Sequence, residues 1–346
     1  MEKPLDYWYN EVTDFSDVLI SGRIRLARNI QEFKFPNKLN LNERNRIINK
    51  IRDVLMNVNF GEGKKLDFIN MSDIPAIQAL SMAERHLISY DMANNPKGRA
   101  VFCSQDRSIS IMINEEDHLR LQFFNSGLNI HDIYGQAQEI DKFLDERLTY
   151  AFDEDLGYLT ECITNIGTGM RVSVSLHLLA LDRCGVINKI STTLSKMGFT
   201  IRGSFGEGSK VKGSFYQISN QITLGLNEDT VIENLKAVIE QIISQERSMR
   251  KSLINDINFQ DTLMRSYGII KYAKIINYEE FIELASLIRL GIAEKIIKEV
   301  DLKTLNYLIN DLGPSTIAYK HGSEISPVKR DIIRAATINQ KLLDLC

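Results

Sequence analysis

Alternating apolar and polar positions mark several strands in the first part of the chain. Four segments either alternate or are rich in β-branched residues, a pattern typical of strands. They are Ser110–Asn114, Arg171–His177, Phe199–Ser204 and Phe215–Thr223. Two longer segments, Ile133–Tyr150 and Glu228–Arg250, repeat apolar residues at helical spacing instead. Because helices do not alternate regularly with the strands, we expect an α+β fold with a largely antiparallel sheet.

The pattern changes after about Leu253, where strand signals end and four helical patterns follow. Apolar positions there recur at helical spacing, with no alternating segment between them. We therefore expect a first domain of mixed structure over residues 1–252 and a second, all-helical domain over residues 253–346.

Capping signals support helices in the second domain. Asn277 opens an Asn-Tyr-Glu-Glu capping box, and Gly313-Pro314 stops a helix that starts near Asp301. Ser326-Pro327 combines an N-cap with proline at the first helical position. This pair predicts a last helix that runs close to the C-terminus.

Composition and charge exclude several classes of protein. The 346 residues are 44% hydrophobic and 25% charged, which is ordinary for a globular protein with a large core. The net charge of −3 gives no general attraction to nucleic acid or to an anionic membrane, so any anion site must be local. No spanning apolar run and no basic-then-apolar leader occurs, and four scattered cysteines form no zinc or disulfide pattern. We expect a cytoplasmic protein that binds neither membranes nor nucleic acid directly.

Five arginines stand at strand ends or beside glycines. Two of them, Arg23 and Arg25, are two positions apart, so a strand would direct both side chains to one face. Fixed guanidiniums can bind a triphosphate bidentately and offset the charge of a phosphoryl-transfer transition state. A single arginine is more often a solvated surface residue, and spacing alone does not show that the five converge. The five are Arg23, Arg25, Arg120, Arg171 and Arg202.

Other candidate segments have two interpretations each. The chain has no G-x-x-x-x-G-K-[ST] phosphate loop, and the glycine-rich stretch Gly203–Gly213 is better explained as a flexible hairpin loop. The polar run Asn114–His118 directly follows a strand-like segment, which usually indicates a turn that caps a helix. Alternatively, a carboxylate in this run receives a cationic substrate, with Glu207 as a second carboxylate.

Taken together, these segments resemble the guanidino (phosphagen) kinases, and within that family the bacterial protein-arginine kinases. They occur in the order and spacing of the family, and no single one is as specific as the set. The resemblance implies an antiparallel sheet flanked by helices, of the glutamine-synthetase-like class, with ATP and Mg²⁺ as co-substrate. The segments are Ser21–Arg28, Asn114–Gln122, Tyr158–Leu176, Arg202–Glu207 and Tyr216–Gln221.

The resemblance also assigns roles to residues of this chain. The substrate guanidinium would meet the carboxylates of Glu116 and Glu207, with the thiol of Cys162 on the substrate side. His86 would lie near the base or ribose of ATP. The remaining nucleotide site would comprise Ser21, Arg23, Arg25, Arg120, Arg171, Val172, Ser173, Val174, Ser175, Arg202, Gly203, Ser204, Phe205, Gly206 and Glu207.

A mechanism follows from the chemistry of the substrate. A protonated guanidinium is a poor nucleophile, so two carboxylates would hold it, orient one nitrogen toward the γ-phosphorus and accept its proton. In-line transfer needs no covalent intermediate, so we expect Cys162 to act by charge and position. The sequence departs from the family at Ser21-Gly22-Arg23, in place of Ser-Ser-Arg, and at Cys162-Ile163, in place of Cys-Pro. The first departure is expected to loosen a phosphate contact, and Thr164 could still donate a hydrogen bond to the Cys162 thiolate.

Two features favour a protein substrate over a free metabolite. Family members that act on small molecules carry a helical domain before the sheet domain, whereas Arg23 lies near the N-terminus and the helical region here follows the sheet. The last helix contains Arg330, Asp331, Arg334 and Ala335, which match the R-D-x-x-R-A sequence that binds phosphoarginine for allosteric activation in the protein-arginine kinases. Arg330 and Arg334 are four apart and so share a helix face, although a solvated face would have the same spacing.

The resemblance implies partners as well. It suggests a homodimer, a zinc-bearing activator protein, a heat-shock transcriptional repressor as substrate, and delivery of marked proteins to a AAA+ protease. Two other functions stay open at this point. One is a metabolic kinase for free arginine, which the domain order disfavours. The other is a binding adaptor without turnover, which the presence of both Glu116 and Glu207 disfavours.

Overall fold

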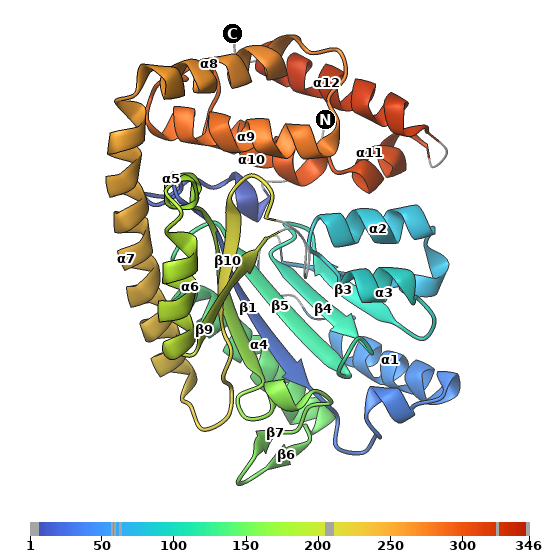
Figure 1. Ribbon diagram of the computed structural model, residues 1–346. Helices are drawn as coiled ribbons and strands as arrows, with labels where there is room; N and C mark the ends of the chain where they lie inside the picture. Colours follow the sequence, from blue (N-terminus) through green and yellow to red (C-terminus); the bar gives the residue numbers. More distant parts are fainter. Residues whose placement is uncertain are drawn as a thin grey trace.

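One eight-stranded antiparallel sheet forms the centre of the first part of the chain (Figure 1). The computed structural model describes residues 7–56, 58, 60–61, 64–204, 211–322 and 325–343. Within these residues the strand order is β2-β3-β4-β5-β1-β8-β10-β9, and every neighbouring pair is antiparallel. The strands are β1 (Leu19–Arg28), β2 (Leu66–Asn70), β3 (Ala100–Ser104), β4 (Ile109–Ile113), β5 (Leu119–Asn125), β8 (Met170–His177), β9 (Phe199–Gly203) and β10 (Phe215–Asn220).

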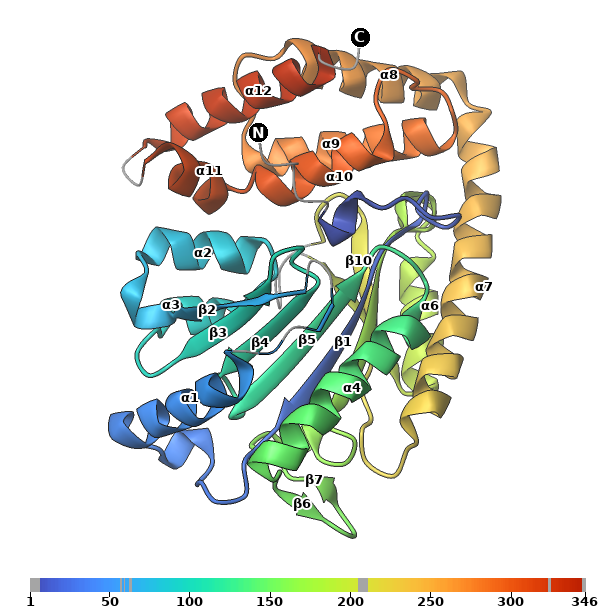
Figure 2. The same cartoon turned by 180° about the vertical axis from the view of Figure 1, so that it is seen from behind.

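The sheet has one apolar face, which helices cover from behind (Figure 2). Alternate residues of a strand point to opposite faces, so Ile24 and Leu26 of β1 lie on the same side as Val172 and Val174 of β8. These four side chains are almost completely buried, in one hydrophobic cluster with the covering helices. The helices are α1 (Leu41–Leu55), α4 (Ile130–Leu148), α6 (Ile187–Lys196) and α7 (Glu228–Ile254).

The opposite face is only partly covered. Two helices, α2 (Ala76–Glu84) and α3 (Tyr90–Asn94), pack on it at one corner, where Val101 of β3 and Met112 of β4 are buried beneath them. No helix stands in front of the middle strands β5, β1 and β8 in Figure 1. We call this uncovered part the open face; it carries the side chains that point away from the main core.

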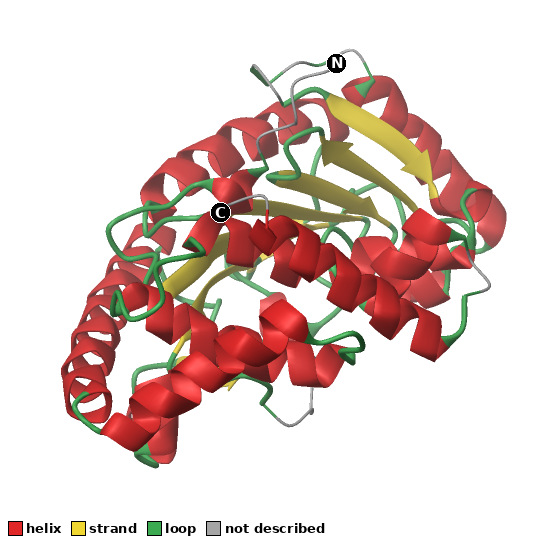
Figure 3. Cartoon of the chain, turned by 90° about the horizontal axis from the view of Figure 1, so that it is seen from above, coloured by secondary structure: helices red, strands yellow, loops and turns green. Residues whose placement is uncertain are grey.

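After α7 the described chain is helical, as expected. Its helices form a layer across one end of the sheet, seen from above in Figure 3. Across the described residues, no helix has both the length and the apolar character needed to cross a membrane. The helices of this layer are α8 (Ile257–Tyr272), α9 (Tyr278–Ala293), α10 (Leu302–Asp311), α11 (Pro314–His321) and α12 (Pro327–Leu343).

This layer contains five described helices, so the expectation of four was wrong. Gly313-Pro314 does end α10, but Pro314 also occupies the first position of α11 and so begins another helix at once. The Asn277 side chain accepts the Glu280 backbone N–H at the start of α9, as expected of an N-cap. The helix expected near Asp301 is α10, and the Asp301 side chain caps it by accepting the Thr304 backbone N–H. The fold class, an antiparallel sheet flanked by helices and followed by a helical region, is confirmed.

Polar contacts hold the helical layer against the sheet. Glu84, the last residue of α2, accepts hydrogen bonds from the backbone N–H groups of Ser315 and Thr316 at 2.7 and 2.8 Å, in the first turn of α11. The Tyr9 hydroxyl donates to Asp311 at 2.9 Å, although these residues are 302 positions apart. Buried bonds to charged acceptors are stronger than neutral ones, so the layer has a defined place over the sheet.

Candidate active site

Four arginines from three neighbouring strands meet on the open face. Arg23 and Arg25 of β1 lie on the same face, opposite Ile24. The β1–β8 register places Arg171 directly opposite Arg25, and β5, the other neighbour of β1, carries Arg120. Sequence spacing alone could not show that these arginines converge, and the strand order explains why they do.

Among the described residues, no carboxylate forms an ion pair with Arg23, Arg25 or Arg171. Burial, followed by the charges of Arg120 and Arg171, lowers the pKa of Arg23. Burial and the charges of Arg23, Arg120 and Arg171 lower the pKa of Arg25 as well. Within the described residues, the Nε atoms of Arg25 and Arg171 are buried without a hydrogen-bond partner. Because guanidinium groups stay protonated in proteins, this face favours a bound polyanion.

Arg120 differs because it has a partner. Its Nη1 lies 2.8 Å from Oε2 of Glu115, and the Glu115 side chain is only 6% exposed. Burial acts to raise the pKa of Glu115. The charge and hydrogen bond of Arg120, with hydrogen bonds from Ser89 and the Glu116 backbone, together lower it below its usual value. The ion pair fixes the direction of Arg120 and leaves its remaining donors for a ligand.

Small polar side chains complete the floor of the open face. Ser173 accepts hydrogen bonds from Arg23 Nε and from Gln217 Nε2, each at 3.4 Å. Val172 and Val174, which we expected in the nucleotide site, are fully buried on the opposite face of β8. Their side chains therefore belong to the core, and only the alternate residues of this strand can present side chains to a nucleotide.

Glu116 lies at the edge of the same face, in the turn between β4 and β5. This turn leads directly into β5, so the capped helix considered for Asn114–His118 does not form. The Glu116 side chain is exposed, and Asn165 Nδ2 lies 3.5 Å from its Oε2. The charge of Glu116 also acts on the pKa of Arg171, against the lowering effects of burial, Arg202 and Arg120. The carboxylate is thus within electrostatic reach of the arginines.

Cys162 lies in the loop that contacts the Glu116 turn, at the start of the short helix η4 (Ile163–Asn165). Its Sγ is 3.0 Å from the hydroxyl of Thr164, which is the contact that the sequence suggested. Ile163, the departure from Cys-Pro, is 81% exposed and does not displace the thiol from this contact. Like Glu116, Cys162 acts on the pKa of Arg171 against the larger lowering effects.

A buried link joins the Cys162 loop to the Glu116 turn. Asp117 Oδ1 accepts hydrogen bonds from Asn29 Nδ2 at 2.6 Å and from the Glu161 backbone N–H at 2.8 Å. Asp117 is 2% exposed, and burial raises its pKa to about 6 against the effect of these two bonds. Asp117, Asn29 and Asn165 were not predicted as site residues, although Asp117 directly follows a predicted carboxylate.

The second predicted carboxylate cannot be placed. Phe205, Gly206 and Glu207 lie outside the described residues. The segment before them is described: Arg202 is exposed on β9, opposite Gln217 of β10. After burial, the charge of Arg202 has the largest lowering effect on the pKa of Arg171, so Arg202 lies close to the other arginines.

Gly22, the departure from Ser-Ser-Arg, would direct a side chain away from the open face. A Cβ atom at this position would point toward α4 and lie 2.7 Å from Asn125 Oδ1 and 3.6 Å from Ile133 Cδ1. A serine there would require the Asn125 side chain to move, on the covered side of the sheet. The expected loosening of a phosphate contact therefore has no support in the geometry.

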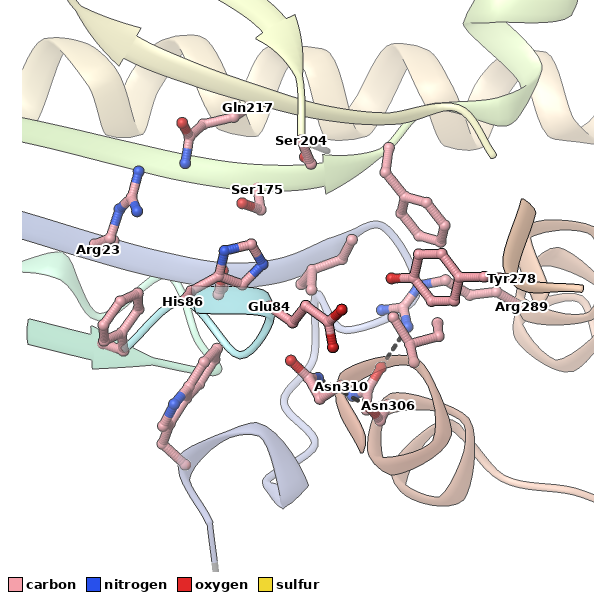
Figure 4. Close-up of a pocket in the computed structure, with 16 residues that line it drawn as sticks. Arg23, Glu84, His86, Ser175, Ser204, Gln217, Tyr278, Arg289, Asn306 and Asn310 are labelled. Carbon is pink, nitrogen blue, oxygen red and sulfur yellow. Dashed lines mark hydrogen bonds between the residues drawn. The ribbon is translucent and has the colours of Figure 1, made fainter. Parts of the chain in front are cut away.

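A cavity adjoins the arginines at the end of the open face (Figure 4). Ser21, Arg23 and Ser175 line its sheet side, together with His86, which has a left-handed φ of 61° just after α2. Ser204, at the end of β9, also lines it. Four of the predicted nucleotide residues outside the arginine set thus surround one space.

The C-terminal motif lies in α12, in the other layer. Arg334 is 1% exposed and donates to the carbonyl oxygens of Leu312 and Ile276 at 3.0 and 2.8 Å, and to Asp331 Oδ1 at 2.5 Å. Ala335 is fully buried, whereas Arg330 is partly exposed. Arg334 is therefore not on a solvated face, and in this structure it holds α12 against α9 and α10.

Two protein-family models match the sequence. "ATP:guanido phosphotransferase, C-terminal catalytic domain" covers residues 46–249, and "Protein-arginine kinase McsB C-terminal domain" covers residues 256–345. Full-length relatives agree with both. The protein-arginine kinase of Clostridium tetani is 41% identical over 98% of this chain and 99% of its own length. That of Clostridium acetobutylicum is 42% identical over 97% of this chain and 99% of its own length.

Solved structures support the same fold. A lombricine kinase superposes with a TM-score of 0.61 over 71% of this chain and 70% of its own, at 23% sequence identity. The duplicated taurocyamine kinase from Schistosoma mansoni with bound transition state analog components gives 0.59 over 92% of this chain and 42% of its own, also at 23% identity. The resemblance inferred from short segments is thus confirmed along the whole chain. The chain therefore belongs to the protein-arginine kinases, a family of guanidino phosphotransferases.

Proposed function

We propose that this kinase binds the triphosphate of ATP on the open face and transfers its γ-phosphoryl group to arginine side chains of proteins. The observation that supports this most directly is the group formed by Arg23, Arg25 and Arg171, which share one face and form no ion pair with a carboxylate of the described residues. A triphosphate supplies the missing negative charge in a form that guanidiniums bind bidentately. Arg120 and Arg202 approach the same group from β5 and β9.

Glu116 receives the acceptor arginine in this proposal. An incoming guanidinium is planar and fully protonated, so a carboxylate can orient one nitrogen toward the γ-phosphorus and take its proton as the N–P bond forms. Asn165 lies 3.5 Å from the Glu116 carboxylate and would limit its rotation. Glu207 is proposed as the second carboxylate by family resemblance, and it lies outside the described residues.

Cys162 acts as a positioning group in the proposed mechanism. The Thr164 hydroxyl, 3.0 Å away, can donate a hydrogen bond to a thiolate and keep the sulfur beside the acceptor guanidinium. The arginines stabilise charge on the transferring phosphoryl group, because their positions are fixed by strands before the reaction begins. A direct in-line displacement requires no bond between phosphorus and sulfur.

Magnesium belongs to the proposal as the ion that accompanies ATP. Among the described residues, no three His, Cys, Asp or Glu side chains gather in a way that could hold a metal ion. Mg²⁺ is usually bound by substrate phosphates and water with few protein ligands, so it can enter with the nucleotide. It would supply additional positive charge at the phosphate oxygens.

Regulation and partners are proposed from the resemblance of the sequence. On this basis we propose a domain boundary between residues 252 and 253, a homodimer and a cytoplasmic location. The proposed partners are a zinc-bearing activator protein, a heat-shock repressor as substrate and a AAA+ protease. Phosphoarginine binding by Arg330, Asp331, Arg334 and Ala335 is proposed on the same basis. Because Asp331 is bonded to Arg334, phosphoarginine would have to replace that bond: its phosphate would take Arg334, and its guanidinium would take Asp331.

The acceptor can be tested by offering two substrates together. The protein is incubated with ATP, Mg²⁺, free arginine and an unfolded protein, and acid-labile phosphate is measured on each acceptor. We expect phosphate on protein arginines and little on free arginine. A higher kcat/KM for free arginine would favour the metabolic kinase, and nucleotide binding without any transfer would favour the adaptor.

A further inference from the structure

The cavity beside Arg23 has a second wall that the sequence did not predict. Figure 4 shows Tyr278 and Asn310 pointing into it from the helical layer, opposite His86. Tyr278 begins α9 and Asn310 belongs to α10, so both come from the helical part that follows the sheet. The cavity is therefore shared between the two parts of the chain.

The sheet side of the cavity offers flat aromatic surface and small polar groups. Trp8 stacks on Phe124 with ring centroids 5.4 Å apart and an interplanar angle of 15°, and both line the cavity. Gln217 adds an amide from β10. Aromatic rings with a few hydrogen-bonding groups are the usual lining of sites for planar ligands.

The helical side offers the same kinds of group and is held in place. The Tyr278 ring has the Arg334 guanidinium 5.6 Å from its centroid, on the side of the motif in α12. Asn310 Nδ2 donates to the backbone oxygen of Asn306 at 2.9 Å. Asn306 in turn accepts from the fully buried Arg289 at 2.7 Å, and Arg289 also donates to the backbone oxygen of Ser16. These bonds fix the helical wall relative to the sheet.

The family resemblance already places the base or ribose of ATP near His86, which lines this cavity. We propose that the helical layer completes the nucleotide site there, through Tyr278 and Asn310. The inference rests on the proposed triphosphate site, because Arg23 belongs to both spaces. A triphosphate bound to the arginines has its nucleoside end free to extend along Arg23 into the cavity. Tyr278 then packs against the base or ribose, and the Asn310 amide hydrogen-bonds the nucleoside edge.

This arrangement has a consequence for specificity. The triphosphate is bound by charge, which any nucleoside triphosphate or inorganic tripolyphosphate satisfies equally. The cavity is the part that can recognise a base, because an amide can pair with the donor and acceptor edge of adenine. The helical layer therefore contributes to ATP affinity while leaving affinity for bare phosphates unchanged.

Two probes separate these contributions. Dissociation constants for ATP and for inorganic tripolyphosphate are measured by calorimetry for Tyr278→Ala, Tyr278→Leu and Asn310→Ala. Tyr272→Ala, which removes a 71% exposed tyrosine from α8, is the matched control. Loss of an aromatic contact to a base typically weakens binding about tenfold or more. We expect that loss for ATP in both Tyr278 variants, a smaller one in Asn310→Ala, and no change for tripolyphosphate.

The outcomes distinguish this inference from the proposed function. If Tyr278→Leu and Asn310→Ala, confirmed as folded by circular dichroism, bind ATP as tightly as Tyr272→Ala does, the helical layer has no part in nucleotide binding and the inference is wrong. It is also wrong if the two ligands lose equal affinity. Arg120→Ala should weaken both ligands, and unchanged affinity for both there would instead remove the triphosphate site.

Discussion

Replacing Asp117 by asparagine tests how the acceptor loop is held beside Glu116. Asp117 is 2% exposed, and it accepts bonds from Asn29 Nδ2 and from the Glu161 backbone N–H. Burial raises its pKa from 3.8 to about 6, although these two hydrogen bonds act in the opposite direction. Asparagine keeps an oxygen acceptor of the same shape without the charge. Asp117→Asn therefore removes the cost of burying a carboxylate and preserves the link.

The sign of the pH effect follows from the direction of this pKa. The folded protein holds the Asp117 proton more tightly than the unfolded chain, so protonation stabilises the fold. That stability is fully present below about pH 4 and is lost as the pH rises through about 6. The difference between 3.8 and about 6 corresponds to roughly 3 kcal/mol of unfolding free energy. Asp117→Asn should gain up to roughly this amount near neutral pH and almost nothing near pH 4.

The assay is urea unfolding of wild type and Asp117→Asn at several pH values between about 4.5 and 7.5. Asp155→Asn, which neutralises an exposed carboxylate in the β6–β7 hairpin (Phe152–Asp153 and Gly157–Tyr158), serves as the control and should show no such difference. In Asp117→Ala the Glu161 N–H loses its acceptor, so phosphoryl transfer should slow while ATP affinity stays the same.

One result would refute this reasoning. If Asp117→Asn lost stability by the same amount at every pH, the carboxylate charge would be needed by its hydrogen-bond donors, and burial would not dominate its pKa. The same conclusion would follow if the unfolding free energies of wild type and of Asp155→Asn both stayed constant over this pH range.

Three further predictions concern charged side chains that stabilise the fold. Arg120→Ala should destabilise the fold by about 3 kcal/mol because it leaves buried Glu115 without its ion-pair partner. Adding Glu115→Gln should restore the stability but not ATP binding. Restored ATP binding in the double variant would contradict the role of Arg120. Glu84→Ala should cost about 2 kcal/mol in thermal or urea unfolding because the first turn of α11 loses its acceptor, and a cost below about 0.5 kcal/mol would oppose that role. Arg334→Ala should cost about 3 kcal/mol and Arg330→Ala less than about 0.5 kcal/mol, and equal costs would show that Arg334 does not anchor α12.

The sequence predicts what depends on local spacing. Alternation along β1 is enough to place Arg23 and Arg25 on one face, because the side-chain period of a strand is two. It cannot place Arg171 opposite Arg25, since that contact depends on pairing between distant strands. The resemblance supplied this convergence where periodicity could not. β3 shows why some strands were not predicted: all of its residues are buried, so no alternation is visible.

Helical spacing has the same limit in the C-terminal region. The four-residue interval correctly places Arg330 and Arg334 on nearby positions of α12, but burial separates them. Arg334 reaches the carbonyl oxygens of Leu312 and Ile276, which are more than twenty residues away in sequence, and Arg330 stays partly exposed. The sequence also could not predict that Tyr278 lines the cavity, because this position depends on how the helical layer packs over the sheet.

The measurement that tests the central claim most directly is phosphoryl transfer by Glu116→Gln. Arginine phosphorylation of an unfolded protein is followed for wild type and variant, with ATP affinity measured on the same samples. If Glu116 orients the acceptor guanidinium and takes its proton, glutamine should lower kcat by roughly 10²-fold or more with ATP affinity unchanged. Transfer at the wild-type rate would contradict the account, because the exposed carboxylate beside the arginines would then have no part in the reaction.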